Sequence, residues 1–105
     1  MKKEPKILLE HIIESIEAIE KYTKGRTKEK FSKAKMMQDA IVRRIEIIGE
    51  AVKNLPPTFR KKHPKIAWQE IAGMRDVLIH EYFGVNINVV WETIRKDIPK
   101  LKKQI

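Results

Sequence analysis

The feature that most constrains this sequence is the spacing of its apolar residues, which recur every three or four positions in four segments. In the longest segment the steps are four, three, four and three, at Ile41, Ile45, Ile48, Val52 and Leu55. Steps that average about 3.6 residues place such side chains on one face of an α-helix. Only residues 85–91 are rich enough in β-branched side chains to suggest a strand, and no second strand is available to pair with them. The sequence therefore predicts an all-α protein.

The order of these apolar stripes predicts the architecture. We expect helices at residues 5–23, 34–55, 66–83 and 87–101, with one short helical turn at 58–63. Short connections make successive helices antiparallel neighbours. The expected fold is an antiparallel, up-and-down bundle of four main helices plus one short connecting helix, in a single domain of residues 1–105. The stripe of the segment 34–55 is broad enough to face both the bundle core and a second subunit.

Proline and capping residues set the expected helix boundaries. Pro5 fits the first turn of its helix, where a missing amide hydrogen leaves nothing unpaired. Pro56 ends the helix before it, because the residue preceding a proline is disfavoured in the helical region. Thr27 and Asn86 are suitable N-caps for the segments that follow them. Pro99 is expected to bend or shorten the end of the last helix, since it lacks a backbone donor.

Length and composition narrow the class of protein. A chain of 105 residues with a hydrophobic share of 42% can bury one small core. It contains no run of eighteen apolar residues and no apolar signal region, so we expect no membrane span and no secretory export. The absence of cysteine excludes disulfides and thiolate metal sites, and it fits a cytoplasmic protein.

The net charge of +9 is concentrated in the connecting segments and the tail. Residues 25–35 carry five cations and one anion, and residues 56–65 carry four cations and no anion. A polyanion such as RNA is a suitable partner for these segments, because neutralised phosphates give affinity that does not depend on sequence. A basic surface that serves only solubility explains the charge equally well.

One stretch, residues 72–83, combines an arginine, a histidine and a tyrosine. At 100° per residue, Tyr82 falls within about 20° of Arg75 on a helix, while Asp76 can reach His80 as an i,i+4 pair. A fixed cation, a group that titrates near neutrality and a phenol are suited to phosphate chemistry. Such residues are more often surface charges or satisfied partners, so their spacing alone does not establish a catalytic role.

Three blocks of the sequence together resemble the HepT-like toxins of the HEPN superfamily. The first is Trp68-x-x-Ile71-x-Gly73-Met74-Arg75-Asp76-x-Leu78-x-His80-x-Tyr82. The second lies at 39–51, and the third comprises Val90-Trp91 and Asp97-Ile98-Pro99-x-Leu101. The resemblance covers roughly residues 5–103 and implies a HEPN-like helical bundle.

The resemblance implies a metal-independent endoribonuclease that acts as the toxin of a type II/VII-like toxin–antitoxin system. In this reading Arg75 holds the scissile phosphate, His80 acts as general acid or base, and Asp76 orients His80. The product is expected to carry a 2′,3′-cyclic phosphate, and no cofactor is expected. The supporting residues, some of which are expected to line the cleft, are Arg43, Glu46 and Glu50.

The same resemblance implies two partners besides RNA. A nucleotidyltransferase antitoxin (MNT) is expected to use ATP and Mg²⁺ to transfer AMP to Tyr82, which would put phosphate charge beside Arg75 and stop RNA cleavage. The chain is also expected to form a homodimer with its cleft at the subunit interface. Pairing two motif helices across a twofold axis would double the sparse set of one Arg and one His per chain.

Other interpretations remain open. The chain could be a non-catalytic RNA- or nucleotide-binding helical dimer that partners a nucleotidyltransferase, or an interaction protein whose motif only docks a partner subunit. A metal site is not indicated, because the three histidines lie in separate segments without ligand spacing. His11 is interpreted as a residue at the rim of the apolar stripe, and His63 is assigned no role.

Overall fold

The structure is a computed structural model that describes residues 4–79 and 86–105, with the side chains of 75–79 excluded. These residues contain helices and no strand, which confirms the all-α prediction. The elements in chain order are α1 (Pro5–Thr23), α2 (Lys28–Lys33), α3 (Lys35–Asn54), α4 (Pro57–Lys61), α5 (Trp68–Ile79), α6 (Ile87–Glu92), the π-helical segment η1 (Thr93–Asp97) and α7 (Ile98–Gln104).

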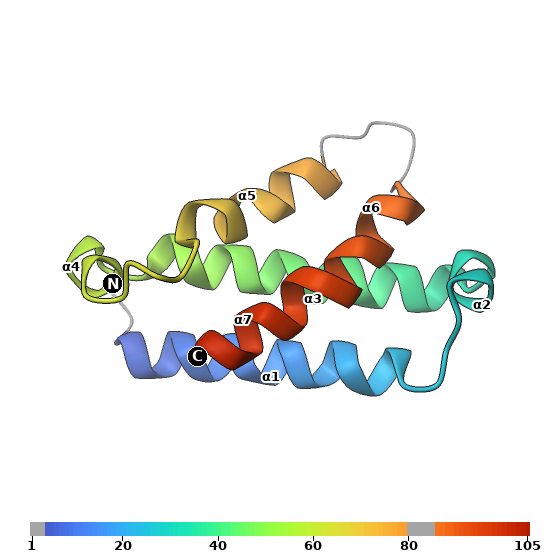
Figure 1. Cartoon of the computed structure of the whole chain (residues 1–105), viewed down its shortest axis with the longest axis horizontal. Helices are drawn as coiled ribbons and strands as arrows, with labels where there is room; N and C mark the ends of the chain where they lie inside the picture. Colours follow the sequence, from blue (N-terminus) through green and yellow to red (C-terminus); the bar gives the residue numbers. More distant parts are fainter. Residues whose placement is uncertain (1–3, 80–85) are drawn as a thin grey trace.

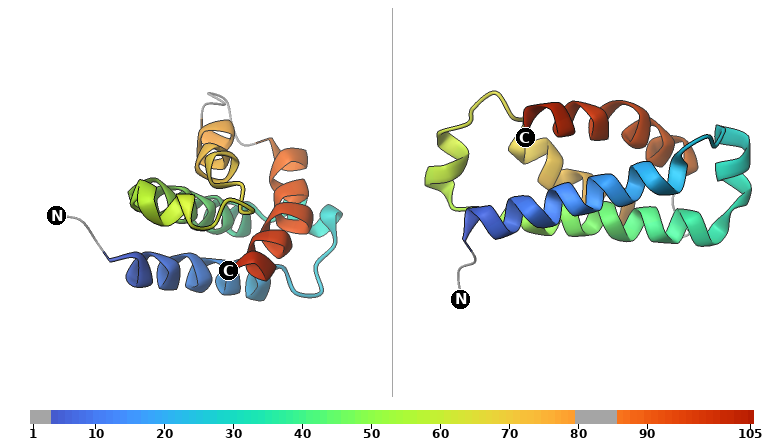
Figure 2. Two further views of the ribbon diagram at one scale, coloured as in Figure 1. Left: turned by 60° about the vertical axis from the view of Figure 1, so that its left-hand side comes forward. Right: turned by 90° about the horizontal axis from the view of Figure 1, so that it is seen from below.

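The four main helical units run up and down, as expected (Figure 1). The long helices α1 and α3 lie side by side and antiparallel, and α5 packs on α3. The continuous unit α6–η1–α7 returns toward the start of the bundle and contacts α1 through α7 (Figure 2). Two short connecting helices, α2 and α4, lie at opposite ends of α3 (Figure 1), where the sequence predicted one.

The core is built from the predicted apolar stripes. The five stripe residues Ile41, Ile45, Ile48, Val52 and Leu55 are at most 1% exposed, the last of them at the C-cap of α3. In α1 the sequence predicts a stripe of Leu9, Ile12, Ile16 and Ile19, widened by Leu8 and Ile13. Leu8, Ile12, Ile16 and Ile19 are buried, and Leu9 is half-buried against the core. Ile13, expected to widen that stripe, is 40% exposed. Since a fully buried Leu or Ile contributes roughly 1.5–3 kcal/mol, this interior is the main source of stability in the bundle.

Both predicted N-caps are confirmed. The Thr27 hydroxyl accepts a hydrogen bond from the Lys30 amide at 3.2 Å. The Asn86 side chain accepts hydrogen bonds from the amides of Asn88, at 3.1 Å, and Val89, at 3.3 Å. These bonds satisfy amides that have no partner within the first turn of a helix.

Pro99 affects the last helix in a different place from the one predicted. The helical unit continues past it to Gln104, and the irregular turn is the π-helical segment immediately before α7. Pro99 has no amide hydrogen to donate, and in a regular α-helix its ring would crowd the carbonyl of Arg95. A wider π turn accommodates that mismatch without ending the helix.

Within the described residues, no helix has both the length and the apolar character needed to cross a membrane.

Candidate functional site

The motif helix α5 is anchored to the bundle at its N-terminal end. Trp68 is 7% exposed, and its indole Nε1 donates a hydrogen bond to the carbonyl oxygen of His63 at 3.0 Å. One turn further on, Ile71 is also buried in the core. Because α5 packs along α3, these contacts set where the later turns of α5 lie relative to α3.

The predicted catalytic residues follow that anchored end. Arg75 and Asp76 lie within α5, so their helical placement is confirmed, although their side chains are not described. The helix begins at Trp68, two residues later than expected, and is described as far as Ile79. His80 and Tyr82 lie outside the described residues. The pairing of Asp76 with His80, and the convergence of Arg75, His80 and Tyr82, stay predictions.

Two of the supporting residues on α3 form an ion pair. Arg43 Nη1 lies 2.8 Å from Glu46 Oε1, one turn away on the same helix. The Arg43 side chain is 67% exposed, whereas that of Glu46 is 27% exposed. Ion pairs on an exposed helix surface contribute only about 0.3–0.5 kcal/mol. Arg43 can therefore exchange this partner for a ligand at little cost in stability.

A groove between α1 and α3 brings two supporting residues together with a histidine. It has a volume of about 180 Å³. Its lining residues are Leu8, His11, Arg43, Ile47, Glu50, Ala51 and Asn54. The groove thus combines a guanidinium, an imidazole and a carboxylate, which can bind an anionic group and exchange a proton with it. Glu46 does not line it.

The sequence did not indicate that His11 belongs to this group. Its position beside the apolar stripe of α1 placed it at the rim, and that position is correct, since the residue is partly exposed. No feature of α1 alone indicated that Arg43 and Glu50 would lie across from it. That proximity depends on how α1 is paired with α3.

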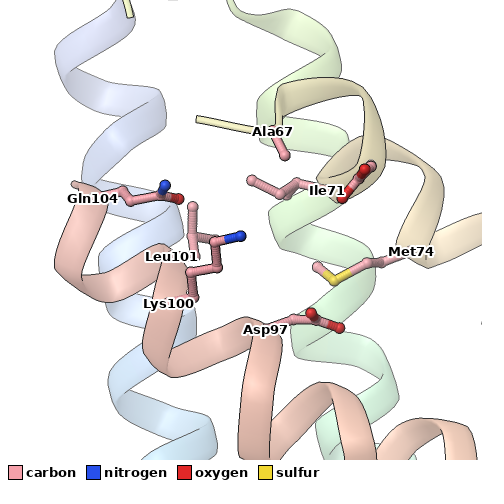
Figure 3. A pocket seen from close by; sticks show the side chains of 8 residues that line it. Ala67, Ile71, Met74, Asp97, Lys100, Leu101 and Gln104 are labelled. Carbon is pink, nitrogen blue, oxygen red and sulfur yellow. The ribbon is translucent and has the colours of Figure 1, made fainter. Parts of the chain in front are cut away.

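A second cavity, of about 150 Å³, lies where α5 faces α7 (Figure 3). Ala67 and Ile71 stand opposite Leu101 and Gln104, and Lys100 extends its amine into the space between them (Figure 3). The remaining lining residues are Glu70, Met74 and Asp97. Because Met74 directly precedes Arg75, this cavity adjoins the first of the predicted catalytic residues.

Two ion pairs away from the groove and the cavity shift the pKa of their members. Lys102 Nζ lies 2.8 Å from Glu20 Oε1, and this hydrogen bond from α7 to α1 raises the pKa of Lys102. Lys96 Nζ lies 2.9 Å from Glu92 Oε2, which lowers the pKa of Glu92. Within the described part of the chain, no group of three His, Cys, Asp or Glu residues is placed to hold a metal ion.

Comparison with known proteins covers nearly the whole chain. The family profile described as "Ribonuclease HepT-like" matches residues 12–105. This range contains α3 and α5, the two helices that carry every residue predicted for the site within the described chain.

Several curated proteins align with the chain along its length. A protein of Methanocaldococcus jannaschii named "Gamma-glutamylcyclotransferase and putative RNase" is 58% identical over 105 residues, which are 100% of this chain and 47% of that protein. A "Putative RNase" of Caldanaerobacter subterraneus subsp. tengcongensis is 56% identical over 98% of this chain and 92% of its own length. A "Probable ribonuclease HepT" of Thermococcus cleftensis is 51% identical over 97% of this chain and 93% of its own. The chain thus spans less than half of the first relative and most of the other two. No solved structure matches the chain.

Proposed function

Because this chain belongs to the HepT-like ribonuclease family, we propose that it is an endoribonuclease that cleaves RNA without a metal ion. The observation that carries the proposal is the family match over residues 12–105, joined to the position of Arg75 and Asp76 on a helix anchored in the core. Curated relatives of similar length bear ribonuclease names, which supports RNA as the substrate class. The proposal places the protein in the cytoplasm.

The proposed reaction is an attack of the RNA 2′-hydroxyl on the adjacent phosphorus. A new 2′-oxygen–phosphorus bond forms while the bond from phosphorus to the 5′-oxygen breaks. His80 accepts the 2′-hydroxyl proton or donates one to the leaving 5′-oxygen. Arg75 binds the phosphate and stabilises the charge that develops on it. The products are a 2′,3′-cyclic phosphate and a 5′-hydroxyl, and Asp76 orients His80.

The residues of α3 are proposed to support the site through charge. Arg43, at the mouth of the groove between α1 and α3, can attract an RNA phosphate that lies away from the scissile bond. Glu46 holds Arg43 in the absence of RNA through the 2.8 Å ion pair. Glu50 lines the same groove and completes its set of polar groups.

Cleavage assays in excess EDTA test the catalytic proposal. The wild-type protein should cut a single-stranded RNA under these conditions, and both Arg75→Ala and His80→Ala should remove most of the activity. Loss of a general acid or base is expected to lower the rate by roughly 10²–10⁴-fold. Activity that requires a divalent ion, or that persists in either folded variant, contradicts the mechanism. RNA binding by the wild type without any cleavage would favour a non-catalytic RNA-binding dimer.

We also propose that the activity is that of a toxin controlled by a nucleotidyltransferase antitoxin. The partner would transfer AMP from ATP to the Tyr82 hydroxyl, so that a phosphodiester forms and pyrophosphate leaves. The added phosphate would occupy the position that an RNA phosphate needs beside Arg75. The proposed assembly is a homodimer, because two motif helices around a twofold axis supply two sets of groups to one cleft.

A further inference from the structure

One end of the bundle carries a group of cations that have no acidic ion-pair partner among the described residues. We call residues 57–65 the α4 corner. Its four cations are Arg60, Lys61, Lys62 and Lys65, and residues 55–69 contain no Asp or Glu. Over the ranges that the structure describes, none of these four side chains forms an ion pair. The Nε atom of Arg60 is buried and has no hydrogen-bond partner there either.

The opposite end of α3 differs although it is also rich in lysine. There Lys33 pairs with Glu29 at 3.4 Å, and Lys35 pairs with Asp39 at 3.4 Å. Figures 1 and 2 both place α2 and α4 at opposite ends of the bundle. Two of the five cations at the α2 end thus have an acidic partner on their own helix, whereas none of the four at the α4 corner has one among the described residues. A polyanion therefore finds more unpaired positive charge at the α4 corner.

Aromatic rings lie among these cations. The exposed ring of His63 is 4.8 Å from the ring of Phe59, centroid to centroid, at an interplanar angle of 45°. Phe59 in turn lies 6.2 Å from Trp68. The imidazole is thus the outermost ring of a series that begins in the core, and the tilted ring of Phe59 packs against it.

The backbone of the corner is held in place on both sides of Pro64. Trp68 Nε1 donates to the His63 carbonyl at 3.0 Å, and Gln104 Nε2 donates to the Lys65 carbonyl at 3.1 Å. The second bond reaches across from α7. A surface that is already ordered loses less entropy when a ligand binds than a flexible loop would.

The adjacent hollow is too small to take in a nucleobase. It has a volume of about 70 Å³ and is lined by Leu9, Phe59, His63, Ile66, Trp68, Gln104 and Ile105. A cavity of about 150 Å³ is known to accommodate benzene, and a nucleobase is larger than benzene. A base can therefore stack across the exposed ring of His63 but cannot enter the hollow.

We propose that the α4 corner binds a single-stranded segment of RNA, with phosphates on its four cations and one base stacked on His63. Positive side chains that follow the backbone, beside an aromatic ring that stacks a base, are the usual means by which proteins bind single strands. The choice of RNA rests on the proposed ribonuclease function. The α4 corner adjoins the start of α5, a helix of 12 residues and thus about 18 Å long. It would therefore hold a part of the strand away from the motif.

Binding can be measured separately from cleavage. The probe is a fluorescein-labelled, fully 2′-O-methylated oligouridine of about 12 nucleotides, within the usual site sizes of single-strand binders. It lacks the 2′-hydroxyl that the proposed reaction needs. Fluorescence anisotropy at several salt concentrations then gives the Kd and its salt dependence for the intact chain and its variants.

Loss of a positive charge and loss of the stacking ring should change the Kd and its salt dependence in different ways. Lys61→Ala combined with Lys62→Ala should weaken binding at least tenfold at low salt. It should also reduce the slope of log K against log salt by about 1.4, because each phosphate contact to a single strand contributes about 0.7. His63→Ala should weaken binding about tenfold through lost stacking, whereas His63→Phe, which keeps a ring, should bind like the wild type.

The matched control removes the same charge from the other end of the bundle. Lys28→Ala combined with Lys30→Ala should change the Kd much less than the α4 pair does. An equal loss in both double variants, or unchanged binding by His63→Ala, overturns the inference. If the probe binding depends on the α4 corner but RNA is never cut, the proposed function fails and this inference stands. If RNA is cut but substitutions in the α4 corner do not change the Kd of the probe, only the proposed binding at the α4 corner is refuted.

Discussion

The hydrogen bond from Trp68 to His63 should stabilise the junction that leads into the motif helix, and Trp68→Phe tests it. Phenylalanine keeps an aromatic ring in the core but removes the indole N–H, which donates to the His63 carbonyl at 3.0 Å. Loss of one such bond costs about 0.5–1.5 kcal/mol, and the smaller buried ring costs about 1 kcal/mol more. We expect the free energy of unfolding to fall by about 1.5–2.5 kcal/mol.

The other tryptophan provides the control. Trp91 is partly exposed, lies 5.2 Å from Phe31 between ring centroids and has the guanidinium of Arg95 5.7 Å from its own ring centroid. Its indole N–H has no hydrogen-bond partner over the described residues. Trp91→Phe should therefore cost less than about 1 kcal/mol, because a partly exposed ring loses little apolar contact.

Urea unfolding followed by circular dichroism at a fixed protein concentration gives both values. The difference between the variants, about 1 kcal/mol, corresponds to a shift of roughly 4–8 °C in Tm for a domain of about this size. The reasoning is refuted if Trp68→Phe is no more destabilising than Trp91→Phe. That result would mean that the bond contributes nothing to the junction between α4 and α5.

Four further outcomes follow from the same structure and proposals. Lys102→Met should lower stability slightly near neutral pH, because pairing with Glu20 raises the pKa of Lys102 in the folded state. The difference from the wild type should vanish as the pH rises past that folded-state pKa. A difference that grows with pH contradicts this. Arg43→Met should leave the melting temperature nearly unchanged, since the ion pair of Arg43 is largely exposed. The same variant should cleave RNA more slowly, and full activity would mean that Arg43 does not belong to the site. Light scattering at micromolar concentration should report twice the mass of one chain, and a monomer argues against the shared cleft. Mass spectrometry after incubation with a cognate nucleotidyltransferase, ATP and Mg²⁺ should find added AMP on the wild type and none on Tyr82→Phe.

Local sequence signals predicted the parts of the fold that depend on local interactions. The steps of three and four residues from Ile41 to Leu55 correctly identified five buried residues of α3 and its C-cap. Thr27 and Asn86 were correctly predicted as N-caps, because a cap needs only its own side chain and the next few amides. The same reasoning placed Leu8, Leu9 and Ile13 together on the apolar face of α1, but only Leu8 is fully buried and Ile13 is exposed, because the partner helix decides which neighbouring positions are covered.

Features that join distant segments were not predictable in this way. The groove with His11, Arg43 and Glu50 exists only because α1 and α3 lie side by side. The series of ring contacts from Trp68 through Phe59 to His63 needs the turn between α4 and α5. For Pro99, the sequence indicated a disturbance but not that a π turn would absorb it before the proline. The motif residues were identified by family resemblance, and their mutual geometry lies outside the described residues.

The most direct test of the central claim is the chemistry of the cut ends. A defined RNA oligonucleotide is incubated with the wild-type protein in excess EDTA, and the fragments are identified by mass spectrometry. A second oligonucleotide of the same sequence then carries a single 2′-O-methyl group at the site of cleavage. The account predicts a 2′,3′-cyclic phosphate on one fragment, a 5′-hydroxyl on the other, and no cleavage at the blocked position. Fragments with a 3′-hydroxyl and a 5′-phosphate, or cleavage at the 2′-O-methylated position, would contradict it.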